Sequence, residues 1–161
     1  MVSHMRPLLI SIAALAVVAP SCSNTPTTPS PTQAAITVSA PSQAPVRACA
    51  ACGGGELEVA ADLTVAETAG VGGSIVSIDV LLRRASTVLA GPGQYNAANV
   101  ALFAGGTNRV PARGSLIVRN VAMHFSNAFR EQLPATFSMQ VTFRDDNGHT
   151  LSGAATVEAV P

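Results

Sequence analysis

Apolar and polar residues alternate with a period of two over much of the chain after residue 56. The clearest runs cover residues 57–66, 76–83, 137–144 and 151–159, where every second side chain is apolar or small. Successive side chains of a β-strand point to opposite faces, so this pattern buries one face and leaves the other in solvent. The four runs therefore predict four half-buried strands.

The last two of these runs are separated by Asp145-Asp146-Asn147-Gly148. An Asn-Gly pair supplies the positive φ that a tight hairpin turn requires. We therefore predict that the runs before and after this turn form a terminal β-hairpin.

Residues between these runs give weaker patterns. Ser115–Phe125 reads as a strand with apolar residues on both faces, and a bulge near Arg119-Asn120 would move the apolar face across. Thr87–Ala90 predicts a short strand that ends at Gly91-Pro92-Gly93.

Two short helical segments are also expected in this region. Asn96 is a good N-cap for one or two helical turns that reach Phe103. A second turn over 129–133 would be stopped by Pro134.

Six or seven short strands with turns between them, in roughly 100 residues, predict an all-β fold, an antiparallel sandwich. The stretch Leu57–Val160 resembles the immunoglobulin-like or fibronectin-III-like modules of bacterial envelope proteins, through its turn over 67–73 and its closing hairpin. The inter-sheet Cys pair and the core Trp of antibody domains are absent. The resemblance therefore implies an immunoglobulin-like β-sandwich, and it carries no function by itself.

The beginning of the chain has the pattern of an export signal. Arg6 precedes an apolar run over residues 8–19, interrupted only by Ser11, and small residues follow it. The run is shorter than the ~20 apolar residues of a transmembrane helix. Residues 1–21 are therefore predicted to be a secretory signal peptide.

Ala19-Pro20-Ser21-Cys22 resembles a bacterial lipobox, although Ala19 stands where Leu is usual. The resemblance implies that Cys22 is lipidated and anchors the protein to a membrane of the cell envelope, at the outer membrane or the periplasmic face. Free secretion is the alternative. Residues 23–46 contain 14 Ser, Thr and Pro among 24 residues and no charge. We expect 22–55 to be a disordered tether and 56–161 to be the sandwich domain.

Charge and aromatic content narrow the range of partners. The chain has 9 basic residues, all Arg, and 9 acidic residues, so the formal net charge is +0. No broad positive field is available to attract nucleic acid. Trp is absent and Tyr occurs once, which leaves few stacking surfaces, so carbohydrate binding is not expected either.

No catalytic motif is found. The sequence has no Gly-x-Ser-x-Gly elbow, His-Glu-x-x-His pair, phosphate-binding loop or dinucleotide glycine pattern. His124 and His149 are interpreted as surface residues. We therefore expect a non-catalytic envelope protein without a cofactor, whose module serves binding, adhesion or structural roles.

Cys49-Ala50-Ala51-Cys52 leaves several interpretations open. The pair can form a local disulfide or remain as two free thiols, and a small thiol-redox protein is the alternative function. A thioredoxin-like pair needs a βαβ unit, which is not predicted here. A zinc site needs a second ligand pair, and only His124 and His149 are available, far apart in sequence.

Calcium binding is a further alternative. Asp145 and Asp146 are adjacent on a loop, and Glu67 could approach from another loop. Calcium takes six to eight oxygen ligands. The competing interpretation is that the Asp-Asp-Asn-Gly sequence is simply turn chemistry, where such side chains bond the local backbone.

The segment 91–113 is the longest irregular stretch of the predicted domain. It is the place where an envelope or surface protein partner could be recognised, and the competing interpretation is an ordered crossover. The candidate recognition residues are Tyr95, Phe103, Asn108, Arg109 and Arg113.

Overall fold

The computed structural model describes residues 31–52 and 55–161. The strands are β1 (Ile36–Ser39), β2 (Gln43–Ala48), β3 (Glu56–Glu67), β4 (Gly73–Arg84), β5 (Thr87–Asn96), β6 (Arg109–Val110), β7 (Ser115–Ser126), β8 (Ala135–Asp145) and β9 (Thr150–Val160). Helix α1 covers Ala97–Phe103, and the 3-10 helix η1 covers Asn127–Gln132.

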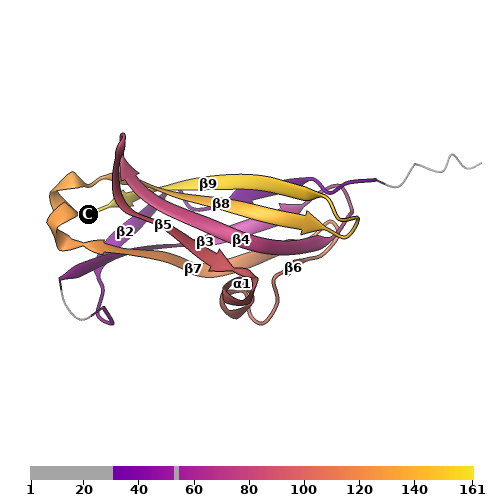
Figure 1. Ribbon diagram of the computed structural model, residues 1–161, viewed down its shortest axis with the longest axis horizontal. Coiled ribbons are helices and arrows are strands. Elements are labelled where there is room, and N and C mark those ends of the chain that lie inside the picture. The colour runs from indigo at the N-terminus through magenta and orange to yellow at the C-terminus, as the bar shows by residue number, and fades with distance from the viewer. Residues whose placement is uncertain (1–30, 53–54) are drawn as a thin grey trace, which may run out of the picture.

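The strands form two packed layers (Figure 1). One layer contains β1, β3, β7 and part of β2, and the other contains β4, β5, β6, β8 and β9. Strand β2 joins both layers, because residues 46–48 pair antiparallel with β3 and residues 43–45 pair parallel with β9. The predicted all-β sandwich of mainly antiparallel strands is confirmed, with nine strands in the described residues where six or seven were expected.

The core follows the alternation read from the sequence. Strand β8 turns Phe137, Met139, Val141 and Phe143 inward, and all four are 0% exposed. Because these side chains point from one layer toward the other, they fill the space between the sheets.

The domain begins earlier than the sequence predicted. Strands β1 and β2 lie inside the segment 22–55 that was expected to be a disordered tether. Ala34 and Ala44 belong to the buried core. The boundary at residue 56 was therefore wrong, because the high Ser, Thr and Pro content concealed two short strands.

The packing of β1 depends on a glycine of β9. A Cβ on Gly153 would lie 2.6 Å from Cγ2 of Val38 on β1, closer than such atoms approach. Gly153 thus lets β1 lie directly against the inner face of β9.

The predicted signal peptide, Cys22 and the first part of the expected tether lie outside the described residues.

The predicted bulge is present in β7. Asn120 has a φ of 51°, and the register with β3 shifts between Ala61 and Leu63. Val118 and Val121 are consequently both 0% exposed, although they are an odd number of residues apart. The bulge therefore keeps the apolar residues on both sides of it on the buried face of β7, as the sequence pattern predicted.

Strand β5 is longer than predicted. It does not end at Gly91-Pro92-Gly93 but continues to Asn96, because the register shift against β4 accommodates the extra residues. Asn96 then caps α1, as predicted, accepting from the backbone N–H groups of Ala98 and Asn99 at 3.0 Å each. The second helical segment, η1, begins two residues earlier than expected, at Asn127.

The terminal hairpin of β8 and β9 is confirmed. Gly148 has a φ of 90°, and the backbone N–H of Asp145 donates to the carbonyl of His149 at 2.9 Å. The turn therefore has three residues between its closing pair.

Within 31–52 and 55–161, no helix has the length and apolar character needed to cross a membrane.

Candidate functional site

Strand β3 connects two chemically different ends of the sandwich. Its first residue, Glu56, pairs with Ser126 of β7, and its last residue, Glu67, pairs with Ile36 of β1. A strand rises ~3.3 Å per residue, so these ends lie about 36 Å apart. We call them the cysteine end, where the β2–β3 loop and the C-terminus lie, and the clasp end, where the β8–β9 turn lies (Figure 1).

A partly exposed carboxylate and an exposed imidazole meet near the cysteine end. Glu58 and His124 are direct cross-strand partners on β3 and β7. Their inward neighbours Leu57 and Phe125 are buried, so alternation turns both functional side chains outward. The His124 side chain is 48% exposed, and its Nε2 lies 2.9 Å from Oε2 of Glu58.

A disulfide joins Cys49 and Cys52 in the loop that follows β2. The loop is closed by the backbone N–H of Cys49, which donates to the carbonyl of Glu56 at 3.0 Å. Cys49 is buried and Cys52 is half-buried. This arrangement holds both sulfur atoms at the surface of the sheet beside β3.

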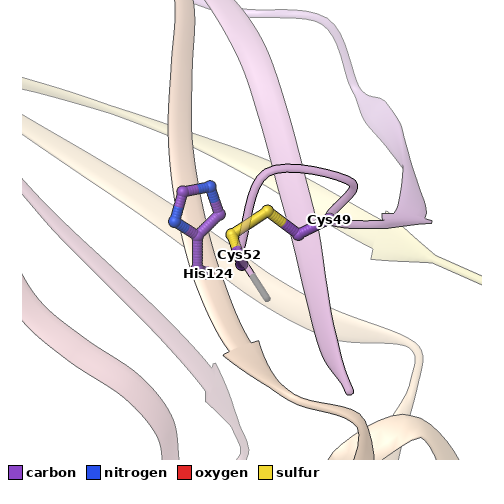
Figure 2. A group of neighbouring side chains, drawn as sticks. All are labelled: Cys49, Cys52 and His124. Carbon is purple, nitrogen blue, oxygen red and sulfur yellow. A yellow bond between two sulfur atoms is a disulfide. The ribbon is translucent and has the colours of Figure 1, made fainter. Parts of the chain in front are cut away.

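The structure brings His124 to this cysteine pair (Figure 2). The two Sγ atoms and a ring nitrogen of His124 all lie within 4.8 Å of one another. From the sequence, His124 was interpreted as a surface residue, and no second ligand pair for the cysteines was evident. Only the register of β3 against β7 places it here, and an alternating pattern does not determine that register.

Arg47 extends this group across the sheet. It is the cross-strand partner of Glu58 on β2, so Arg47, Glu58 and His124 form a row over three strands. A hollow of about 120 Å³ lies beside the row, lined by Pro45, Arg47, Glu58, Ala60 and Asn120. The cysteine end therefore presents thiol-derived sulfur, imidazole, carboxylate and guanidinium groups on one accessible face.

The surroundings of Cys49 differ from those of a thioredoxin-like pair. Cys49 follows strand β2 and does not open a helix. The helix dipole that activates such cysteines therefore does not act on it. His124 is the group that can interact with a thiolate at this position.

The clasp end is organised around Glu67, which is 2% exposed. Its carboxylate accepts backbone N–H groups from Ala35, Ala69, Gly70 and Arg113, at distances between 2.8 and 3.3 Å. Burial raises the pKa of Glu67, but these donors outweigh burial and lower it to about 2. The side chain is therefore a structural anion that ties three segments together.

Asp145, next to Glu67, also accepts hydrogen bonds from backbone N–H groups. Its side chain accepts from the backbone N–H of Ala34 at 3.1 Å and of His149 at 2.7 Å, and Nδ1 of His149 lies 3.1 Å away. Burial raises the pKa of Asp145, and the N–H groups of Ala34 and His149 together with the His149 side chain lower it below its usual value. Glu67 and Asp145 thus hold the consecutive amides of Ala34 and Ala35.

Asp146, the third predicted calcium ligand, does not point toward Glu67 and Asp145. Asp146 forms a bidentate ion pair with Arg109, with contacts of 2.6 and 3.0 Å. The oxygens of Glu67 and Asp145 face N–H donors, so a cation would have to displace those bonds. The structure does not bring Asp145, Asp146 and Glu67 together around a common point within the described residues.

The residues predicted to form a recognition loop have partners inside the domain. Oη of Tyr95 donates to the carbonyl of Ala122 at 2.8 Å and accepts from its N–H at 2.9 Å, and the Tyr95 ring meets Phe103 edge-on at 5.7 Å. Asn108 donates to the carbonyl of Ile75 at 2.9 Å. Arg109 pairs with Asp146, and Arg113 donates its backbone N–H to Glu67.

A second hollow lies on the outer face of the other layer, over β4, β5, β8 and β9. It has a volume of about 240 Å³. The residues that line it mix apolar and polar side chains: Asp79, Val80, Leu81, Arg83, Pro92, Ser138, Met139, Gln140 and Ala154. This face has no local motif in the sequence, because its lining residues come from four separate strands.

Comparison with known proteins gives no family. A scan against family descriptions and a search of curated proteins found no match. Among solved structures, the chain is similar to the collagen binding subdomain of the Enterococcus faecalis surface protein ACE, over 78% of this chain and 95% of that one. The sequence identity is 11% and the TM-score is 0.26.

Proposed function

We propose that the protein is a non-catalytic binding module of the bacterial cell envelope. Residues 1–21 export the chain, lipidated Cys22 anchors it, and the sandwich binds a polypeptide partner. The Ser-, Thr- and Pro-rich segment before the domain provides reach from the membrane.

The hollow over β4, β5, β8 and β9 carries this proposal. Its volume of about 240 Å³ is smaller than the ~300–1,000 Å³ of typical small-molecule sites. A hollow of that size accommodates a side chain of a larger partner. Leu81 and Pro92 offer apolar contact there, while Asp79 and Arg83 offer charges of both signs.

The surroundings of the hollow favour an extended contact. The outward residues of β8 and β9 around it are small or uncharged, including Ser138, Gln140, Ser152, Ala154 and Thr156. Such residues carry few strongly hydrated groups that binding would have to desolvate. This face therefore suits a polypeptide that lies across the sheet.

A photocrosslinking amino acid in place of Ala154 tests this assignment in intact cells. We expect one adduct of defined mass from position 154, and its loss when Leu81 is replaced by Arg. The matched control is the same photocrosslinker at Ile117, which is exposed on β7 in the opposite layer. Equal adducts from both positions, or none from position 154, would contradict the proposed face.

The anchor is tested separately by labelling with an alkyne fatty acid. We expect label on the wild type and on Cys49→Ala/Cys52→Ala, and no label on Cys22→Ala. Label that persists in Cys22→Ala would reject the lipid anchor without bearing on the binding face.

A further inference from the structure

We propose that Cys49, Cys52 and His124 form a zinc site when the Cys49–Cys52 disulfide is reduced. This inference goes beyond the proposed function, because it concerns the cysteine end and not the outer face of the other layer. In the oxidised chain the two sulfur atoms are bonded to each other and the site is closed to the metal.

The positions of the ligands carry the proposal. The Sγ atoms and a ring nitrogen of His124 already lie within 4.8 Å of one another. Around tetrahedral zinc, with bonds of ~2.3 Å to sulfur, two thiolates lie about 3.8 Å apart. Opening the disulfide and rotating the two side chains reaches that separation, and the two-residue spacing of the cysteines is the one common in structural zinc sites.

Glu58 orients the imidazole of His124. Its Oε2 lies 2.9 Å from Nε2 of His124. Metal-binding histidines commonly bond a carboxylate through a ring nitrogen, and this contact fixes the orientation of the ring. Water completes the coordination, as in zinc sites with three protein ligands. Glu58 and His124 are presented by the rigid pair β3 and β7, whereas the cysteines come from the adjoining loop.

A small thiol supplies the two electrons that reduction of the Cys49–Cys52 disulfide requires. Two molecules of a small thiol transfer two electrons to the Cys49–Cys52 bond, which yields two cysteine thiols and one disulfide of the reductant. Zinc then replaces the two thiol protons, which are released to solvent, and a ring nitrogen of His124 binds the metal.

The donor set selects the class of metal. Two thiolates and an imidazole favour a borderline or soft ion such as zinc and disfavour calcium and magnesium, which prefer all-oxygen sites. The half-exposed His124 leaves a path from solvent to the site.

Cobalt titration of the purified full chain tests the site, because tetrahedral cobalt–thiolate complexes absorb visibly. The protein is reduced with a phosphine, freed of it without oxygen, and titrated with Co²⁺ and then Zn²⁺. We expect one equivalent of Co²⁺ to give thiolate charge-transfer bands, Zn²⁺ to abolish them, and Ca²⁺ to have no effect. The oxidised protein should give no bands.

Substitutions of His124 and of its partner Glu58 keep the test independent of folding, because both side chains reach solvent. His124→Ala and Glu58→Gln should each weaken Zn²⁺ binding about 10-fold or more. His149→Ala, at the clasp end, should bind as the wild type does. Absence of bands in reduced wild type would overturn the proposal. Unchanged affinity in His124→Ala would overturn it as well, since the cysteines alone would then account for binding.

Discussion

The two ends of β3 carry glutamates with opposite roles. Glu67 at the clasp end is buried, and backbone N–H groups surround its carboxylate. Glu58 toward the cysteine end is partly exposed and faces a single imidazole. The same type of side chain therefore has two roles: Glu67 stabilises the fold at the clasp end, and Glu58 remains available for chemistry at the cysteine end.

This difference follows from the groups that each carboxylate binds. Without Glu67, several backbone N–H groups of the 67–70, 111–114 and 34–35 segments would lose their acceptor in a buried place. Without Glu58, only a solvent-accessible imidazole loses a neighbour. The clasp end is consequently the structural base of the module, where the N-terminal segment joins it, and the cysteine end points away from that junction.

The largest expected effect concerns the N-terminal boundary. A chain that begins at Glu56 lacks β1 and β2, and it lacks the Ala34 and Ala35 donors of the clasp. We expect it to show no cooperative thermal transition by circular dichroism. A chain that begins at Pro31 is the control and should melt at the temperature of the full chain. A cooperative transition in the shorter chain would show that the clasp is dispensable.

Acid should weaken the clasp end specifically. The folded pKa of Glu67 lies near 2, below its ordinary value of 4.5, and the pKa of Asp145 is lowered in the same direction. A depressed carboxylate pKa gives stability that is complete above the ordinary value and is lost as pH falls toward the folded value. The urea midpoint should therefore decline between about pH 4.5 and 2. A flat profile over this range would contradict the clasp.

Tyr95→Phe should have an intermediate effect. The hydroxyl bridges the two layers through both backbone groups of Ala122. Its removal leaves a donor and an acceptor without their partner, at a cost of about 1–2 kcal/mol in unfolding free energy. Urea unfolding measures this loss. A loss below about 0.5 kcal/mol would mean that water replaces the bridge.

The smallest effect is expected at the cysteine end. Cys49→Ser/Cys52→Ser opens a very short loop, and disulfides of short loops restrict the unfolded chain little. The melting temperature should fall by only a few degrees, and photocrosslinking from position 154 should be unchanged. Loss of the adduct in this variant would link the cysteine pair to partner binding.

Much of the fold was predictable because strand alternation, turn chemistry and capping are local. The runs around Phe137 and Val141, the Gly148 turn and the Asn96 cap all act over a few residues. Strands β1 and β2 were missed because they are short, and because their stability comes from pairing with β3 and β9.

The candidate site was less predictable because it depends on long-range register. His124 and Glu58 were visible as outward positions, but only the pairing of β3 with β7 makes them neighbours. The same holds for Tyr95, whose bond to Ala122 turns a presumed recognition residue into a bridge between layers. A polar side chain in the sequence does not reveal whether its partner is solvent or distant backbone.

One matched pair of substitutions tests the contrast between the two ends most directly. Glu67→Gln and Glu58→Gln make the same chemical change on the same strand, and urea unfolding at pH 7 compares them. We predict that Glu67→Gln loses about 2 kcal/mol or more of unfolding free energy, because an amide cannot accept all of the backbone donors, while Glu58→Gln loses less than about 0.5 kcal/mol. Equal losses, or a larger loss in Glu58→Gln, would contradict the assignment of stability to the clasp end and chemistry to the cysteine end.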